Sequence, residues 1–323
     1  MNVCVKQSNP RKPLPTGIAK MSFYVGEVLK ATRFKKLISV HIAAAMLAFS
    51  AGQSWAQDKD RDATTDSGAA AGQAQQDDVS KALDSTATQW SFQFAYETID
   101  WKDDLVNGQP RAPGLDNFVQ LRIVAPFVFE KFTLLPRLTL RHYENLRTGE
   151  TGLGNTELFG LIVPRKWDWG TGRTGLGPLV TLPGDESVAR DEWGYGLAGA
   201  VVNTSGKWFY GVLLTQSWRA IDPQTLPVGT SDTNPLGIAP FLNYQLGKGW
   251  YVGNGDMVIQ YDWDSEEVYM PIGVRFGKVI PADKGSWNAY LEVQTALIYE
   301  NWLGSAKDSS IRINLTKTLP VGF

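Results

Sequence analysis

Residues 311–323 read Ile-Arg-Ile-Asn-Leu-Thr-Lys-Thr-Leu-Pro-Val-Gly-Phe. Apolar side chains occupy the odd positions, apart from Lys317, and polar or small residues occupy the even ones. Because successive side chains of a strand point to opposite faces, the segment predicts a strand with one apolar and one polar face. A strand of a soluble β-sandwich can show the same alternation, so the number of strands and their connections must separate the two classes.

The same pattern recurs from Gln89 onward. Aromatic and β-branched residues dominate this region, and clusters of Gly, Asn, Asp and Pro divide it at regular intervals. About 20 residues are available for each strand and its connection, and a membrane-crossing strand needs about 9–11. Twelve strands are predicted, at 89–101, 117–129, 131–143, 154–165, 168–181, 192–203, 207–218, 237–247, 249–262, 267–279, 286–299 and 309–321.

The connections alternate in length through the first eight and are more even beyond them. Long connections are predicted at 102–116, 144–153, 182–191 and 219–236, and short ones at 130, 166–167, 204–206 and 247–249. Transmembrane barrels have short periplasmic turns and longer outer loops, whereas a soluble sandwich has no reason to alternate in this way. We therefore expect an all-β fold, a transmembrane antiparallel β-barrel of the outer-membrane type with about 12 strands. An even number of strands would place both termini on the periplasmic side.

The N-terminal part predicts export. Basic residues precede an apolar run at 37–51, and Ser54-Trp55-Ala56 supplies small residues for a cut after Ala56. This is the pattern of a secretory signal peptide, and the run is too short for a transmembrane helix. We expect a signal peptide at 1–56, with a normal length if translation starts at Met21, and a disordered periplasmic tail at 57–88.

Removal of residues 1–56 has two chemical consequences. The single cysteine, Cys4, is lost, so the remaining chain has no disulfide or thiolate chemistry. Eight basic residues and one acidic residue are lost with it, which leaves 23 basic and 32 acidic residues and a net charge of about −9. Such a chain would repel nucleic acid.

The apolar strand faces are expected to meet outer-membrane lipids and lipopolysaccharide. Eleven tryptophans follow residue 56, most of them near predicted strand ends, where indole rings suit the two membrane–water interfaces. The opposite faces would line the lumen. These carry Glu97 and eight further charged candidates, Arg122, Arg137, Arg141, Glu157, Asp256, Asp262, Arg275 and Glu292. Such a set predicts either a binding station for a polar or anionic solute or a network of ion pairs that fills a narrow barrel.

Catalytic and cofactor chemistry finds little support. His142 is the only histidine after residue 56, and it falls on the apolar face of its strand with Glu144, not a serine, two positions on. We interpret it as an interfacial histidine and expect no catalytic residue, metal site or cofactor. The acidic segment 262–267 suits either bound cations or a solvated loop.

Several segments resemble a known family. Gly152-Leu153-Gly154-Asn155-Thr156-Glu157-Leu158-Phe159, followed by Gly175-Leu176-Gly177-Pro178, is similar to proteobacterial outer-membrane putative transporters. These are related to outer-membrane proteins of phenol meta-degradation pathways, and some are mislabelled as neuromedin U. The resemblance covers 150–323 well and the first three strands weakly. It implies uptake of small, hydrophobic or aromatic molecules and identifies no binding residues; the family usually has Asp in place of Asn155.

The C-terminal strand also resembles the closing strand of bacterial outer-membrane barrels. That resemblance implies that the segment ending at Phe323 is recognised by the barrel-assembly machinery.

Three functional hypotheses follow. The first is a barrel for passage or uptake of small solutes, whose lumen charges select the solute while loops 144–153 and 219–236 restrict access. The second is a non-conducting structural or adhesion barrel whose outer loops bind partners. The third is an outer-membrane lipid-modifying enzyme. The sequence favours the first.

Overall fold

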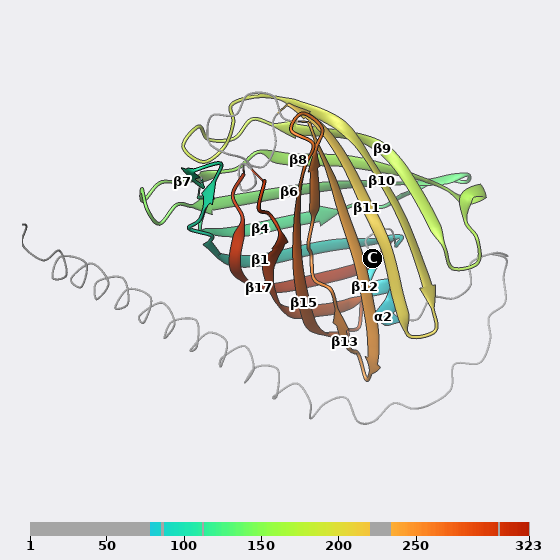
Figure 1. Ribbon diagram of the computed structural model, residues 1–323. Helices are drawn as coiled ribbons and strands as arrows, with labels where there is room; N and C mark the ends of the chain where they lie inside the picture. The colour runs from blue at the N-terminus through green and yellow to red at the C-terminus, as the bar shows by residue number, and fades with distance from the viewer. Residues whose placement is uncertain (1–77, 85–86, 112, 220–233, 303, 323) are drawn as a thin grey trace, which may run out of the picture. The chain divides into compact units, whose positions relative to one another are not determined.

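The computed structural model describes residues 78–84, 87–111, 113–219, 234–302 and 304–322. Residues 89–320 form a closed antiparallel barrel with twelve wall strands (Figure 1). The fold class predicted from the sequence is therefore confirmed. The predicted signal peptide, most of the predicted tail and most of the connection 219–236 lie outside the described residues.

The wall strands start and end close to their predicted positions. The interrupted ninth strand consists of β13 and β14, which both pair with β12 and β15. The wall comprises β1 (Gln89–Trp101), β4 (Asn117–Val124), β6 (Phe132–Glu144), β8 (Thr156–Pro164), β9 (Arg173–Leu182), β10 (Gly194–Ser205), β11 (Trp208–Arg219), β12 (Pro235–Gly247), β13 (Trp250–Gly253), β14 (Ile259–Asp262), β15 (Glu267–Pro281), β16 (Ser286–Ile298) and β17 (Lys307–Pro320). Short elements in the connections are β2 (Leu105–Val106), β3 (Gln109–Pro110), β5 (Phe127–Val128), β7 (Thr151–Leu153) and the 3-10 helix η2 (Arg165–Trp167).

Two predicted strands differ locally. The strand predicted at 117–129 stops at Val124, and only β5 pairs beyond it. Pro126 lies at the gap and has no N–H to donate to a neighbouring strand. The strand predicted at 168–181 begins at Arg173, because Trp169 and Gly172 bond each other across a turn.

The first and last strands close the barrel. β1 and β17 pair from Gln89↔Pro320 to Ile99↔Ser310 without a shift in register. The strand predicted at the end of the sequence is therefore present and supplies one side of this seam. Closure gives each described wall strand a neighbour on both sides, which the hydrocarbon of a membrane requires because it offers no hydrogen-bond partner to an unpaired backbone group.

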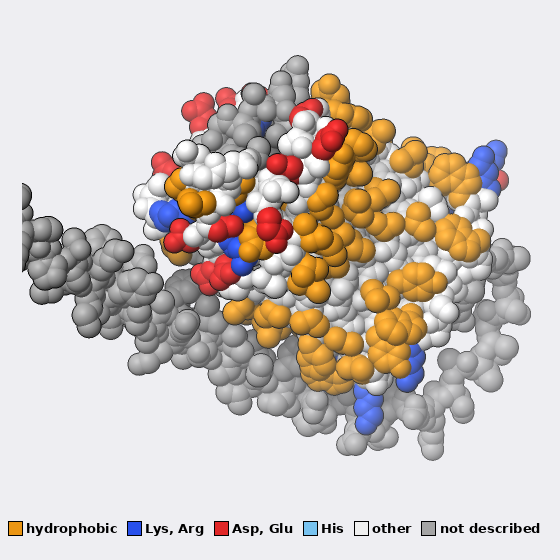
Figure 2. Space-filling view, in the orientation of Figure 1, with side chains coloured by type: hydrophobic (Ala, Val, Ile, Leu, Met, Phe, Trp, Pro, Cys, Tyr) orange, Lys and Arg blue, Asp and Glu red, His pale blue; other side chains and the backbone are white. Residues whose placement is uncertain are grey.

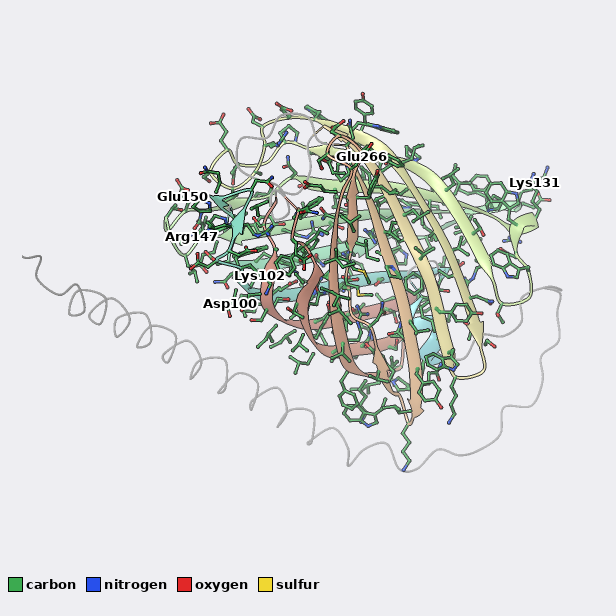
Figure 3. All side chains as sticks on the ribbon, viewed as in Figure 1. Asp100, Lys102, Lys131, Arg147, Glu150 and Glu266 are labelled. Carbon is green, nitrogen blue, oxygen red and sulfur yellow. The ribbon has the colours of Figure 1, made fainter. Side chains whose placement is uncertain are left out.

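The two ends of the barrel differ. We call one end the loop end; its connections include 102–116, 145–155, 183–193 and 299–306. The other is the turn end, with connections that include 206–207, 248–249 and 282–285. Figure 3 places Glu150 and Arg147 at the loop end and Lys131 at the opposite end. Both Gln89 and Pro320 lie at the turn end because the number of wall strands is even.

Apolar side chains cover the outside of the wall. Phe94, Leu291 and Ile311 are 52%, 47% and 48% exposed, on β1, β16 and β17. Figure 2 shows apolar side chains as a broad band over the strands, with most of the visible acidic side chains gathered beyond it at the loop end. Exposure of this much apolar surface is unfavourable in water and favourable in lipid.

Most tryptophans follow the predicted arrangement, but Trp101 packs against a buried cluster that contains Ile99 and Phe118, and Trp302 is buried. Trp167, Trp208 and Trp250 are exposed at the turn end, and Trp193 and Trp263 at the loop end. Trp302, in the connection between β16 and β17, is instead only 2% exposed and packs with Tyr269. Its predicted place in an interfacial girdle is therefore wrong, because its side chain joins a buried cluster with Tyr269, Ala296 and Ala306.

A close approach between strands explains one of the glycines in the family-like segment. A Cβ atom on Gly177 would overlap the carbonyl oxygen of Gly160 on the neighbouring β8. The sequence predicts that glycine in a barrel strand permits such an approach, and any larger residue here would force β8 and β9 apart.

A short helix lies at the turn end, within the stretch predicted as a tail. Helix α2 (Asp78–Leu83) packs Val79, Ala82 and Leu83 against a buried cluster that contains Tyr251. Asp84 continues the contact through an ion pair of 2.7 Å with Arg173 of β9. No helix of the described residues is long and apolar enough to cross a membrane.

Candidate functional site

The inside of the barrel is divided into an apolar and a charged part. The apolar cluster includes Leu135, Phe159, Leu161 and Leu179 on β6, β8 and β9. The charged part lies on β1, β4, β15, β16 and β17, where alternation along each strand turns the polar side chains inward. The two parts meet at β6 and β8, which carry Arg137 and Glu157.

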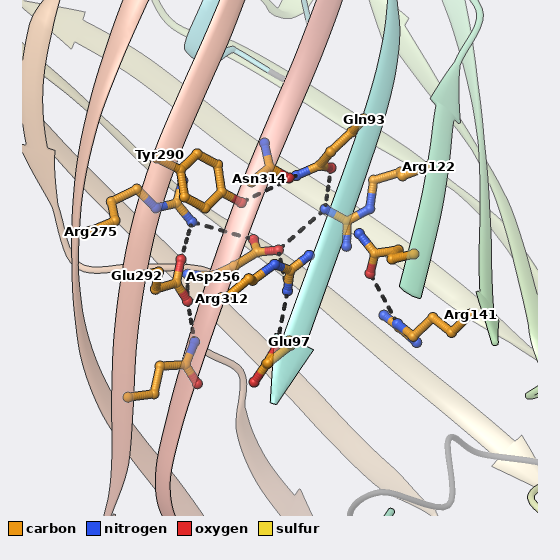
Figure 4. A network of polar contacts seen from close by, with 12 residues as sticks. Gln93, Glu97, Arg122, Arg141, Asp256, Arg275, Tyr290, Glu292, Arg312 and Asn314 are labelled. Atoms are coloured by element: carbon orange, nitrogen blue, oxygen red, sulfur yellow. Dashed lines mark hydrogen bonds and ion pairs between the residues drawn. The ribbon is translucent and has the colours of Figure 1, made fainter. Parts of the chain in front are cut away.

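Asp256 lies at the centre of the charged part, as Figure 4 shows. Its carboxylate oxygens are 3.3 Å from Arg122 Nη1, 3.4 Å from Arg312 Nη1 and 3.7 Å from Arg275 Nη2. The three arginines come from β4, β17 and β15. One carboxylate therefore joins strands from both sides of the β1–β17 seam.

The interruption between β13 and β14 positions this carboxylate. Gly255 has φ of +82°, which a side-chain-bearing residue rarely adopts. The Asn254 side chain accepts a hydrogen bond from Leu242 N–H and donates one to the Pro240 carbonyl, so it replaces lost backbone pairing with β12. The backbone N–H of Asp256 donates to Glu292 Oε1 at 2.8 Å. These contacts hold the segment away from the regular wall and place Asp256 among the arginines.

Each arginine of this network has a second partner. Arg122 donates to Gln93 Oε1 at 3.0 Å, Arg275 pairs with Glu292 at 3.2 Å, and Arg312 pairs with Glu97 at 3.5 Å. Lys307 also pairs with Glu97, at 2.5 Å. Because each buried charge has more than one oppositely charged or hydrogen-bonding partner, the network offsets the free energy that an unpaired buried charge would cost.

A cavity of about 220 Å³ opens beside the network. Arg122, Arg137, Arg312 and Asp256 line it, together with uncharged residues of β9, β11 and β12. Five cationic side chains and three carboxylates line it, an excess of two positive charges. A second cavity of about 160 Å³ lies at the turn end and shares no lining residue with the first. The interior thus holds solvent-sized space on both sides of its packed middle.

Eight of the nine predicted lumen residues, Glu97 among them, come together in the structure. Arg122, Arg275, Glu292 and Asp256 are connected as described, and Arg137 pairs with Glu157 at 2.9 Å. Arg141 donates to Gln120 Oε1 at 3.0 Å and lines the cavity. Asp262 stands apart: it accepts hydrogen bonds from the backbone and hydroxyl of Ser265 and so stabilises the turn after β14. Asp262 is buried but does not line the cavity.

Two residues that the candidate set omits complete the network. Arg312 lies on the polar face of the C-terminal strand, and Lys307 is at the start of the same strand. Alternation along residues 311–323 already places Arg312 inward, so that signal could have found it. Lys307 lacked such a signal because it precedes the predicted start of the strand.

His142 lies outside this site. It is exposed on β6, and its cross-strand neighbours are Val119 and Leu153, neither of which has a nucleophilic side chain. Among the described residues no group of three or more His, Cys, Asp or Glu side chains is placed to hold a metal ion.

A closed antiparallel barrel with an apolar outer surface and a polar interior defines the class as a transmembrane β-barrel of the outer-membrane type. The chain is similar in structure to the COG4313 outer membrane channel from Pseudomonas putida F1, with a TM-score of 0.55 and 15% sequence identity, over 72% of this chain and 96% of that one. A weaker similarity links it to the outer membrane channel DcaP of Acinetobacter baumannii, with a TM-score of 0.34 and 10% identity over the same shares of the two chains. No protein-family model matches the sequence, and no curated protein has a significantly similar sequence.

Proposed function

We propose that this protein is an outer-membrane channel for small solutes, with both termini on the periplasmic side. The observation that carries the proposal is the cavity inside the closed wall, lined by opposed charges. A barrel that served only as a scaffold would gain nothing from arginines held beside solvent-sized space. The structural similarity to a named outer membrane channel supports the same function.

The arrangement of the interior favours a selective channel over a general porin. Cavities lie on both sides of a middle section filled by the apolar cluster and the charge network. Passage therefore requires a solute to displace or slip past side chains that have partners. Opposed charges across a narrow lumen create a transverse electric field. This field makes the channel selective among polar solutes for their size and charge.

We further propose that the solutes have a hydrophobic or aromatic part. Leu179, Leu213 and Val258 line the cavity together with the arginines, so the space accepts an apolar body. The resemblance to the transporter family related to phenol-degradation proteins supports the same class of solute. The exposed apolar belt would contact lipid and lipopolysaccharide, and the C-terminal strand would be recognised during assembly.

Single-channel recording of the purified full-length protein in a planar bilayer tests this function. We expect small, steady conductance steps with measurable ion selectivity, because the lumen is narrow and charged. A folded protein that stays silent in the bilayer and does not admit small aromatic solutes into liposomes would refute the proposal. Resistance to unfolding by SDS without heating serves as the test of folding.

A further inference from the structure

The main cavity has two chemically different walls. Arg122 and Arg137 lie on β4 and β6, and the register pairs Arg122 with Thr139, two residues from Arg137 on the same face. Such diagonal neighbours lie about 7–8 Å apart, within reach of two long side chains. Leu213 and Ala239 line the cavity from β11 and β12 on the far side of the barrel, and Leu179 lines it from β9, which adjoins β8. One wall therefore offers positive charge and the other apolar surface.

The charged wall has hydrogen-bond donors in excess. Among the described residues, buried Nε atoms of Arg122, Arg137 and Arg312, and Nη2 of Arg312, have no acceptor. Arg312 is itself only 5% exposed. Among the buried carbonyl-type and carboxylate oxygens of the described cavity lining, Gln260 Oε1 alone lacks a donor. A buried N–H without an acceptor is unfavourable, so turning these guanidinium groups toward a ligand that supplies acceptors alone would be favourable.

The partners of these two arginines leave room for such a ligand. Arg137 pairs with Glu157 through Nη2 and lies over the ring of Phe159 at 4.0 Å, which leaves Nε unpaired. Arg122 uses Nη1 for both Gln93 and Asp256, and its Nε is also unpaired. A carboxylate between the two guanidinium groups would accept charge-assisted hydrogen bonds from both.

We propose that the cavity binds a small monocarboxylate with an apolar body, such as benzoate. The carboxylate lies between Arg122 and Arg137, and the body packs against the wall formed by Leu179, Leu213 and Ala239. At about 220 Å³ the cavity is smaller than the ~300–1,000 Å³ of sites for drug-sized ligands, which restricts the body to about one ring. This inference rests on the proposed function, since it names the class of solute that the channel carries.

Calorimetric titration of the purified full-length protein in detergent tests the site. The probes are benzoate, neutral benzamide, acetate and inorganic phosphate. We expect benzoate to bind at least about tenfold more tightly than each of the others, because benzamide lacks the charge and the two anions lack the apolar body. Equal binding of benzoate and benzamide, or of benzoate and phosphate, would overturn the proposal, the second result indicating a general anion site.

Two variants with opposite expected effects make the test independent of folding. Arg137→Gln should weaken benzoate binding by about tenfold or more through loss of a charged donor. Glu157→Gln should strengthen it, because Arg137 then has no competing carboxylate; a variant that fails to fold cannot bind more tightly. Arg147→Gln is the matched control, as this arginine lies in a loop-end connection and not on the cavity. No gain of affinity in Glu157→Gln, or an equal loss in the control, would contradict the inference.

The binding assay and the conductance assay can refute the two proposals independently of each other. Steady conductance without benzoate binding would overturn this inference and leave the channel function intact. Benzoate binding that responds to the two variants, in a protein that neither conducts nor admits solute, would support the site and refute the channel.

Discussion

Replacing Asp256 by Asn should make the channel more selective for anions. The carboxylate is 32% exposed and lies within 3.7 Å of three arginines, so its removal deprives the lumen of a negative charge without changing its shape. At about 4 Å a unit charge contributes about 1 kcal/mol to the energy of a passing ion in a water-like medium. This contribution has opposite signs for an anion and a cation, so its loss changes the difference between them by about 2 kcal/mol. Because about 1.4 kcal/mol corresponds to tenfold, the ratio of anion to cation permeability should rise about 25-fold.

The barrel should tolerate this change. Arg122 keeps Gln93, Arg275 keeps Glu292 and Arg312 keeps Glu97, so none of the three guanidinium groups loses its last partner. The backbone hydrogen bond from residue 256 to Glu292 does not depend on the side chain.

The assay is the reversal potential of single channels under a gradient of KCl. Asp283→Asn, in the exposed turn between β15 and β16, is the control and should leave the reversal potential unchanged. If Asp256→Asn also leaves it unchanged while the variant remains folded, the current does not pass the network. The assignment of this site to the conduction path would then be wrong.

Four further outcomes are expected. Replacing Arg137 and Arg141 together by Gln should shift the reversal potential toward cations, opposite to the Asp256 change; unchanged selectivity would count against their role. Asp84→Ala removes one partner of a buried ion pair, at a cost of about 3 kcal/mol, so limited proteolysis should cut the segment around α2 faster than in the parent. Arg111→Ala frees the β2–β3 hairpin from the Tyr299 and Gly304 carbonyls, which should lower the temperature at which SDS unfolds the barrel. The hydrogen bond from Arg111 lowers the pKa of Asp104, so the stability from this pair should persist above pH 4 and be lost as the pH falls through that lowered value; loss at neutral pH, measured by proteolysis of the hairpin, would contradict this.

The sequence predicted most of the wall strands because the alternation of apolar and polar residues along each strand follows which side chains face lipid and which face the lumen. On β16, Leu291 and Val293 face outward while Tyr290 and Glu292 are buried, as the alternation predicts. Deviations arise where a local feature interrupts the alternation. Pro126 lies where β4 stops, and Gly255 opens the gap between β13 and β14.

The candidate site was predictable only in part. Alternation identifies which charged residues turn inward, but it does not say which of them meet. Asp262 and Asp256 look alike in the sequence, yet one stabilises a turn and the other joins three arginines. Helix α2 was missed because six residues carry too little periodicity to be distinguished from a polar tail.

The sequence by itself determined the fold class, the number of strands and the inward or outward direction of nearly every side chain, since these follow from local alternation and from the spacing of turns. Only the tertiary structure decided that Asp256 meets Arg122 and Arg312, from strands far apart in the chain, and that Lys307 reaches Glu97. The physical reason is closure of the sheet: pairing of β1 with β17 brings residues more than 200 positions apart into contact, and no local pattern encodes that distance.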